Sequence, residues 1–122
     1  MSSLTFQLAV PATELSPNAR IHWGRKAVAV KTAREAAKAE AERVLRDAGS
    51  RPMWARASYR ATLYHLSART PDPDNFIASL KACLDGIADA GVVANDRGLW
   101  PERPQFVRVE RLPRVEITIT PE

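Results

Sequence analysis

The sequence predicts a single α+β (mixed α/β) domain, in which a mixed four-stranded sheet packs against two main helices in the order β-α-β-α-β-β. Three observations lead to this fold class: a length of 122 residues, two long amphipathic stretches rich in helix formers, and four shorter stretches with alternating apolar residues. A chain of this length lies in the usual range of one domain, and no repeat or low-complexity linker divides it. We therefore treat residues 1–122 as one domain.

Two segments have the composition and periodicity of helices. Residues 25–48 are rich in Ala, Glu, Lys and Arg, and Gly49 provides a stop signal. The second segment starts at Asp72 and Pro73 and runs to about Ala90, just before Gly91. One face of each helix is apolar and should pack on the sheet: Val30, Ala33, Ala37, Ala41, Val44 and Ala48 in the first, and Phe76, Leu80, Cys83, Leu84 and Ile87 in the second.

The four predicted strands are residues 5–10, 57–67, 107–111 and 115–120, with a turn at Leu112 and Pro113. The stretch from 57 to 67 is apolar enough on both faces to be a central strand. Because helical segments separate the first three strands and a short turn joins the last two, we expect parallel and antiparallel pairings in one sheet.

The charges are unevenly distributed around a net charge of +4. Residues 18–69 carry twelve Lys or Arg against four Asp or Glu, whereas residues 70–102 carry two against six. A basic body with one acidic region suits a protein that binds a polyanion and holds cations against it, although scattered solvated charges would give the same composition. No apolar stretch reaches the length of a membrane span, no export signal is recognisable, and Cys83 is the single cysteine. We expect a cytoplasmic protein.

Three aspartates stand out by their positions. Asp72 and Asp74 lie where the predicted central strand meets a helix, and Asp96 follows in the loop beyond that helix. Hard cations such as Mg²⁺ prefer oxygen ligands and need few of them from the protein, so these carboxylates predict a metal site. Local structure offers another explanation: Asp72 before Pro73 is a helix N-cap, Asp74 favours the helix dipole, and Asp96 is a turn residue.

The arrangement of these residues resembles the RusA family of Holliday junction resolvases. The similarity covers nearly the whole chain and is most specific over residues 69–97. There, Asp72-Pro73-Asp74-Asn75 is followed by a helix with Leu84-Asp85-Gly86-Ile87 and then by Gly91-Val92 and Asn95-Asp96. Leu15-Ser16-Pro17-Asn18 with His22-Trp23, and the segment from Pro113 to Ile119, are similar to the two ends of the family pattern.

This resemblance implies a homodimeric, metal-dependent endonuclease that resolves four-way DNA junctions by paired nicks. Asp72, Asp74 and Asp96 match the family carboxylates that bind Mg²⁺ or Mn²⁺. The sequence departs from the pattern at Asn95, where the family has aspartate, and at Ala78, where it has the catalytic lysine.

Lys81 lies three residues beyond Ala78, on a neighbouring face of the helix. It either takes over the catalytic role or pairs with Asp85 at i,i+4 on the surface. Asn75, Asp85 and Asn95 are second-layer candidates around the metal, with the surface as the alternative for Asp85. Asp89 is expected to face solvent.

DNA contacts are expected from the basic part of the chain, because phosphate binding depends on Lys and Arg. The basic candidates, each of which is alternatively a solvated surface residue, are Arg20, Arg25, Lys26, Lys31, Arg34, Lys38 and Arg69. Asn18 and His22 are further candidates that line the cleft, and the alternative for His22 is a capping or packing role. Three tryptophans either stack on opened bases or are buried or packed in an interface: Trp23, Trp54 and Trp100.

Three functions remain open at this point. The leading one is a junction-resolving nuclease acting in DNA recombination and repair, on chromosomal, replication-fork or prophage DNA. The second is a protein of the same fold that binds junctions without cutting them, and the third is a structural dimer without a nucleic-acid role. Cutting requires the carboxylates to converge, so their geometry is the first property to check.

Overall fold

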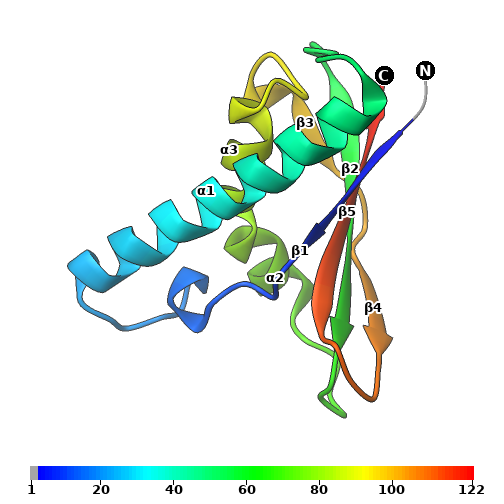
Figure 1. Ribbon diagram of the computed structural model, residues 1–122. Helices are drawn as coiled ribbons and strands as arrows, with labels where there is room; N and C mark the ends of the chain where they lie inside the picture. Colours follow the sequence, from blue (N-terminus) through cyan, green and yellow to red (C-terminus); the bar gives the residue numbers. More distant parts are fainter. Residues whose placement is uncertain (1–2) are drawn as a thin grey trace.

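A computed structural model describes residues 3–122 and contains one mixed sheet with all helices on one of its sides (Figure 1). The strands are β1 (Leu4–Leu8), β2 (Ala57–His65), β3 (Leu99–Pro101), β4 (Gln105–Arg108) and β5 (Arg114–Pro121). The helices are α1 (Trp23–Ala48), α2 (Pro73–Ser79) and α3 (Lys81–Asp89), with short 3-10 turns η1 (Thr13–Leu15) and η2 (Asp96–Gly98). The predicted fold class is confirmed.

The sheet has the order β1-β5-β2-β3. β4 also pairs with β2, along residues 62–65, whereas β3 pairs with residues 57–59 of the same strand. β5 is antiparallel to both β1 and β2, whereas β3 and β4 are parallel to β2. The long strand β2 is central, as its apolar character predicts. β3 is a fifth strand that the sequence analysis did not predict, because three residues ending in a proline show no readable alternation.

The core lies between the sheet and the helices. Alternate residues of the strands point into it, so that Phe6 lies opposite Ile117 on β5, and Ile117 lies opposite Ala61 on β2. The outward-facing positions of β1 and β5 are polar and pair across the strands, as Thr5 does with Thr118 through their hydroxyls. Among residues 3–122, no helix has both the length and the apolar character needed to cross a membrane.

α1 packs against the rest of the protein from Ala33 onward, and its first turns are mostly exposed. His22 caps its start, and Gly49 ends it with a left-handed φ of 81°. The buried side chains of α1 are Ala37, Ala41 and Leu45, and the half-buried Ala33 and Val44 pack against the core, so the predicted apolar face holds from Ala33 to Val44. Ala48, predicted on the same face, is exposed in the last turn. Val30, predicted to pack on the sheet, is exposed because the first turns of the helix extend past the sheet edge (Figure 1).

The predicted second helix is divided into α2 and α3 at Leu80. The Ser79 hydroxyl donates to the Phe76 carbonyl at 2.6 Å, and the amide of Leu80 donates to the Ile77 carbonyl rather than continuing the α-helical pattern. A serine that bonds back to its own helix bends it, and the tightened last turn ends α2. The break turns α3 against α1, where Gly86 allows backbone contact with Arg34.

Candidate functional site

The start of α2 is organised by Asp72. Its carboxylate accepts hydrogen bonds from the backbone amides of Asp74 at 2.9 Å and Asn75 at 3.4 Å, and Pro73 occupies the first turn. These features define a helix N-cap, so the local explanation of Asp72 is confirmed. Asp74 lies exposed in the first turn, where its charge favours the helix dipole.

Lys81 joins two acidic residues from different parts of the chain. Its ammonium nitrogen lies 2.9 Å from Asp85 Oδ1 on α3 and 2.5 Å from Asp96 Oδ2 at the start of η2. The hydrogen bond from Lys81 holds the pKa of Asp96 below its usual value, against a smaller opposing effect of desolvation. Hydrogen bonds to Asp85 and Asp96 raise the pKa of Lys81. Lys81 is therefore both the i,i+4 partner of Asp85 and a bridge to Asp96.

The loop that carries Asp96 is fixed by its backbone. The amides of Met53 and Trp54 donate to the carbonyls of Gly91 and Val92, and the amide of Ala94 donates to the Trp54 carbonyl at 2.9 Å. A Cβ added at Gly98 would lie 2.2 Å from the Ala55 carbonyl oxygen, so only glycine permits this close approach.

Asn95 lies in the same loop, at the position where the family motif has aspartate, and its side chain has a structural role. Its side-chain oxygen accepts a hydrogen bond from the amide of Arg97 at 2.9 Å and caps η2. This cap holds the first residue of η2, Asp96, in the position from which its carboxylate contacts Lys81.

A second ion pair lies beside the first. The guanidinium of Arg34 on α1 contacts both carboxylate oxygens of Asp89 on α3, at 2.6 Å and 2.9 Å. This two-bond geometry is the stronger form of an arginine–carboxylate contact. The hydrogen bond from Arg34 lowers the pKa of Asp89 and raises that of Arg34 itself. Asp89 is exposed, as expected, and it also pairs with Arg34, which the sequence analysis did not predict.

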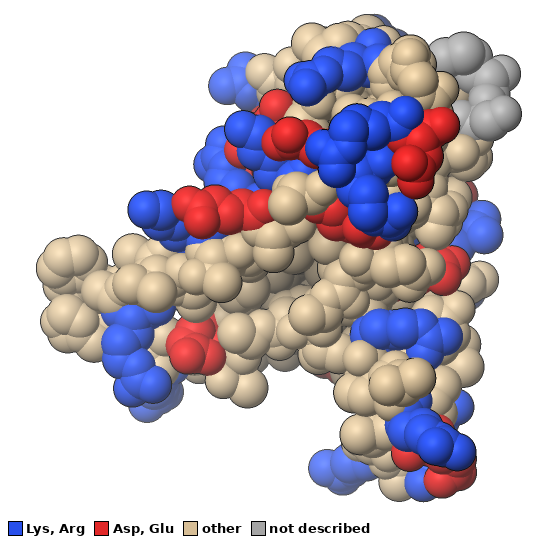
Figure 2. All heavy atoms as spheres, in the orientation of Figure 1, with Lys and Arg blue, Asp and Glu red and all other residues tan. Residues whose placement is uncertain are grey.

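These side chains surround a small polar cleft of about 190 Å³ between α1, α3 and the loop before η2. Arg34, Asp85, Asp89, Asn95 and Asp96 line it, and Lys81 closes the contact between Asp85 and Asp96. Three carboxylates face two cationic side chains there. Figure 2 shows acidic and basic atoms crowded on the upper part of the molecule, over α1 and α3.

The predicted convergence of Asp72, Asp74 and Asp96 is absent from this arrangement. Among residues 3–122, no three His, Cys, Asp or Glu side chains are grouped so that they could hold one metal ion. The Asp72 carboxylate binds the amides of the first turn of α2 and Asp96 binds Lys81, while Asp74 lies exposed in the first turn of α2. The Mg²⁺ requirement stays a prediction.

The predicted DNA-binding residues are distributed over the loop before α1, α1 itself as far as Lys38, and the loop after β2. His22 Nδ1 accepts a hydrogen bond from the amide of Gly24 at 3.1 Å, so His22 is a helix cap. Lys31 pairs weakly with Glu35 at 3.9 Å. Lys26 is half-buried, and the others are exposed, which leaves them accessible to a phosphate backbone: Asn18, Arg20, Arg25, Lys38 and Arg69.

The three tryptophans separate into two groups. Trp23 and Trp100 are 78% and 62% exposed, whereas Trp54 is half-buried and packs against the core. Burial within the chain therefore holds for Trp54, whereas for Trp23 and Trp100 stacking on bases and packing in an interface stay predictions. Sequence alone gave no sign of this difference, because all three lie in loops or at element ends.

Comparison with known proteins adds one relative. No family model matches the chain. A protein of Xylella fastidiosa (strain Temecula1 / ATCC 700964), described as an uncharacterized protein, is 43% identical over 90 residues. The match covers 74% of this chain and 58% of the relative, so the chain spans less than two thirds of that protein's length.

Fold and site together define a class: a single α+β domain in which two helices and a loop present a charged cleft at one side of a mixed sheet.

Proposed function

We propose that this chain is a Mg²⁺-dependent, structure-selective DNA endonuclease of the RusA type, which resolves four-way junctions in the cytoplasm as a homodimer. The observation that carries the proposal is the contact of Lys81 with Asp85 and Asp96. It brings a lysine and two carboxylates from distant parts of the chain to one exposed cleft, and two of these three residues were selected from the sequence as catalytic.

The donor set suits a hard cation. Asp85 and Asp96 direct carboxylate oxygens at one positive centre, the ammonium of Lys81, and Mg²⁺ is commonly held by one or two carboxylates together with water. Bound there, Mg²⁺ or Mn²⁺ would supply an activated water and neutralise phosphate charge. Asp74, also selected from the sequence, does not line this cleft and lies exposed at the start of α2, where it would be a separate place for the ion.

The chain's own residues have separate roles in this proposal. Lys81 has a flexible stem and an exposed ammonium that can neutralise the charge developing on phosphate oxygens. Arg34 holds α3 beside α1 through Asp89 and so positions Asp85. The basic side chains of the first half of α1 contact the DNA arms through phosphates, which makes binding sensitive to salt.

A second candidate is a junction-binding protein that does not cut. It is favoured by two observations: the carboxylate of Asp72 is engaged in capping, and the ammonium of Lys81 already neutralises that of Asp96. Cleavage of a labelled synthetic four-way junction, with and without Mg²⁺ or Mn²⁺, separates the two functions.

The experiment compares wild type with Asp96→Asn, Asp74→Asn and Asp85→Asn, and uses Asp47→Asn as the matched control. Asp47 is an exposed aspartate at the far end of α1, paired with Arg43. We expect Asp96→Asn to bind the junction but cut it roughly 100-fold more slowly or worse, as for loss of one electrostatic group at a reacting centre. Asp47→Asn should cut as wild type does.

The remaining variants locate the ion. Loss of cutting in Asp85→Asn with normal cutting in Asp74→Asn would assign the ion to the cleft around Lys81, and the reverse result would assign it to the start of α2. If wild type binds junctions tightly and never cuts them with either metal, the non-cutting function replaces the nuclease. Failure to bind at low salt would remove nucleic acid from the function altogether.

A further inference from the structure

The side of the sheet that faces away from the helices is open. In the part of the chain that the structure describes, no element covers this face (Figure 1). Side chains alternate along each strand, and because Ala61 of β2 and Ile117 of β5 are buried in the core, their neighbours point outward. The outward positions of β1, β2 and β5 are Thr5, Gln7, Ser58, Arg60, Thr62, Tyr64, Arg114, Glu116, Thr118 and Thr120.

Aromatic rings stand at two ends of this open face. Trp100 of β3 lies opposite Ser58 and is 62% exposed, whereas its neighbour Leu99 packs against the core. Near the other end of β2, Tyr64 lies opposite Arg114 of β5, and the Arg114 guanidinium stacks over the Tyr64 ring at 4.0 Å from its centroid. The face therefore has a bare indole ring at one end and a ring covered by a guanidinium at the other.

An arginine lies between the two rings. The Arg60 side chain is 51% exposed, and its ion pair with Glu102 is long, at 3.9 Å. An exposed ion pair of this kind contributes little to stability, so the guanidinium is free to bind another anion. Ser58 and Tyr64 are six residues apart on β2, which corresponds to about 20 Å along the strand. Trp100, Arg60 and Tyr64 thus form a row of about that length.

The charge near this row is positive and is carried by arginine. Residues 97–114 contain five Arg and two Glu, and the four lysines of the chain lie elsewhere, in α1 and α3. A guanidinium binds phosphate through two parallel hydrogen bonds and stacks on flat rings, which an ammonium group does not do. This combination of rings and guanidinium groups complements a polyanion whose own rings are accessible.

We propose that the open face of the sheet binds an unpaired nucleic-acid strand, with one base on Trp100, another on the Tyr64–Arg114 pair, and the phosphates between them on Arg60. The bases of a duplex stack on one another, so only an unpaired strand presents its bases to such rings. A row of about 20 Å takes roughly four nucleotides, the lower end of the site sizes of single-strand-binding domains.

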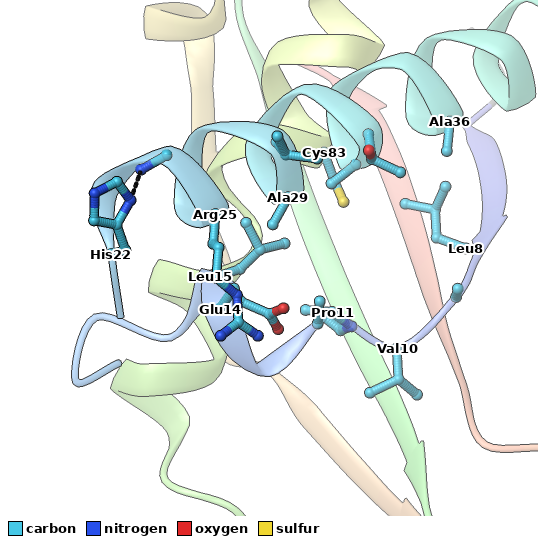
Figure 3. A pocket seen from close by; sticks show the side chains of 16 residues that line it. Leu8, Val10, Pro11, Glu14, Leu15, His22, Arg25, Ala29, Ala36 and Cys83 are labelled. Atoms are coloured by element: carbon cyan, nitrogen blue, oxygen red, sulfur yellow. Dashed lines mark hydrogen bonds between the residues drawn. The ribbon is translucent and has the colours of Figure 1, made fainter. Parts of the chain in front are cut away.

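This surface is separate from the others on the molecule. The cleft beside Arg34 and the basic side chains of α1 lie on the helix side of the sheet. So does an apolar groove of about 740 Å³ between α1 and the segment from Leu8 to Leu15, which charged side chains enter only at Glu14 and Arg25 (Figure 3). The open face therefore binds its strand whether or not the cleft cuts junctions.

The test is the binding of fluorescently labelled (dT)12 to the full chain at low salt, followed by anisotropy. An abasic strand of the same length has the same phosphates without bases, and we expect it to bind at least about 5-fold more weakly, since each stacked base contributes that much. Trp100→Ala should weaken the binding of (dT)12 by roughly 5- to 150-fold, the range for loss of one stacking side chain. Arg60→Ala should reduce the slope of log K against log salt by about 0.7, as for loss of one phosphate contact to a single strand.

Two variants serve as controls. Val28→Ala removes an apolar side chain that is 66% exposed on α1, on the helix side, and should bind (dT)12 as wild type does. Trp100→Phe keeps a ring on the sheet and should recover most of the affinity that Trp100→Ala loses. The same strand should quench the tryptophan fluorescence of wild type, and this quenching should decrease in Trp100→Phe. A (U)12 strand compared with (dT)12 tells whether RNA or DNA is preferred, and tight binding of either through Trp100 is the expected result.

Three results would overturn the proposal. The first is a wild type that binds neither strand at low salt, and the second is equal affinity for (dT)12 and the abasic strand. The third is binding that Arg25→Ala weakens and Trp100→Ala does not, since the strand would then lie on α1. A chain that binds (dT)12 through Trp100 but never cuts junctions would leave this surface standing and remove the nuclease.

Discussion

Substitution of Gly86 by alanine tests how α3 is held in place. A Cβ at this position would lie 2.2 Å from the Arg34 carbonyl oxygen, and 3.0 Å from both the Ala37 Cβ and the Lys38 amide nitrogen. Two of these neighbours are backbone atoms of α1, which cannot turn aside as a flexible side chain can. To restore an ordinary contact beyond 3.4 Å, α1 and α3 must separate by about 1 Å.

The free energy of unfolding should fall as a result. Overpacking of a tight contact costs about 1–3 kcal/mol, and the better helix propensity of alanine returns up to about 1 kcal/mol. The net loss expected for Gly86→Ala is about 1–2 kcal/mol, which for a domain of this size lowers Tm by roughly 3–8 °C. Separation of the helices also lengthens the Arg34–Asp89 contact, so the geometry of the cleft should change in the same variant that loses stability.

The assay is urea unfolding followed by far-UV circular dichroism, with Gly24→Ala as the matched control. Gly24 also lies in α1, but its added Cβ would meet only the imidazole of His22, at 3.1 Å and 3.3 Å. We expect the control to unfold at a urea concentration equal to or above that of wild type, because the better helix propensity of alanine applies there without a clash against backbone atoms. A Gly86→Ala variant within about 0.5 kcal/mol of wild type, which is the range of ordinary surface substitutions, would refute the close approach of the two helices.

Two further predictions concern titratable groups. Burial raises the pKa of the Cys83 thiol to about 11, so the native protein should not react with a thiol reagent at pH 8, whereas urea-unfolded protein should react at once. In Lys81→Met, the pKa of Asp96 should rise toward its ordinary value while that of Asp89, held low by Arg34, stays unchanged, as followed by NMR titration of the carboxyl carbons. Because the lowered pKa of Asp96 favours its charged form in the folded protein, this contribution to stability is present above the ordinary carboxyl pKa and disappears as the pH falls through the lowered one. An Asp96 pKa that does not move in the variant would contradict the contact with Lys81.

The fold class was predictable because the periodicities are strong where the elements are long. β5 alternates over eight residues and the burial of its side chains follows that alternation, whereas β2 is buried on both faces around Thr62, as expected for a central strand. The break at Leu80 was not predictable, because the apolar stripe continues through it and only the Ser79 hydroxyl shows that the chain turns. The exposure of Val30 was not predictable either, because helical periodicity shows which residues share a face of the helix but not whether another element packs on that face.

The sequence predicted which residues form the site better than it predicted the contacts between them. Lys81 and Asp96 were both chosen from the sequence, and they meet. Asp72 has the same charge, but a proline beside it and two free amides ahead of it made an N-cap the local use of its carboxylate. Sequence shows where negative charge accumulates, and only the folded chain shows which cation neutralises it.

Lys81 explains how an acidic cleft persists in a folded protein. Asp85 and Asp96 would repel each other at close range in water, and the ammonium between them removes that cost. Arg34 does the same for Asp89 from the other side of the cleft. With both cations in place, the cleft keeps one carboxylate in excess and stays accessible to solvent. The two cationic side chains make the cleft tolerable without a ligand, and the one carboxylate in excess leaves it attractive to a metal cation. Both proposed functions are compatible with such binding. They differ in one measurable property, which is whether cation binding leads to cutting of the DNA.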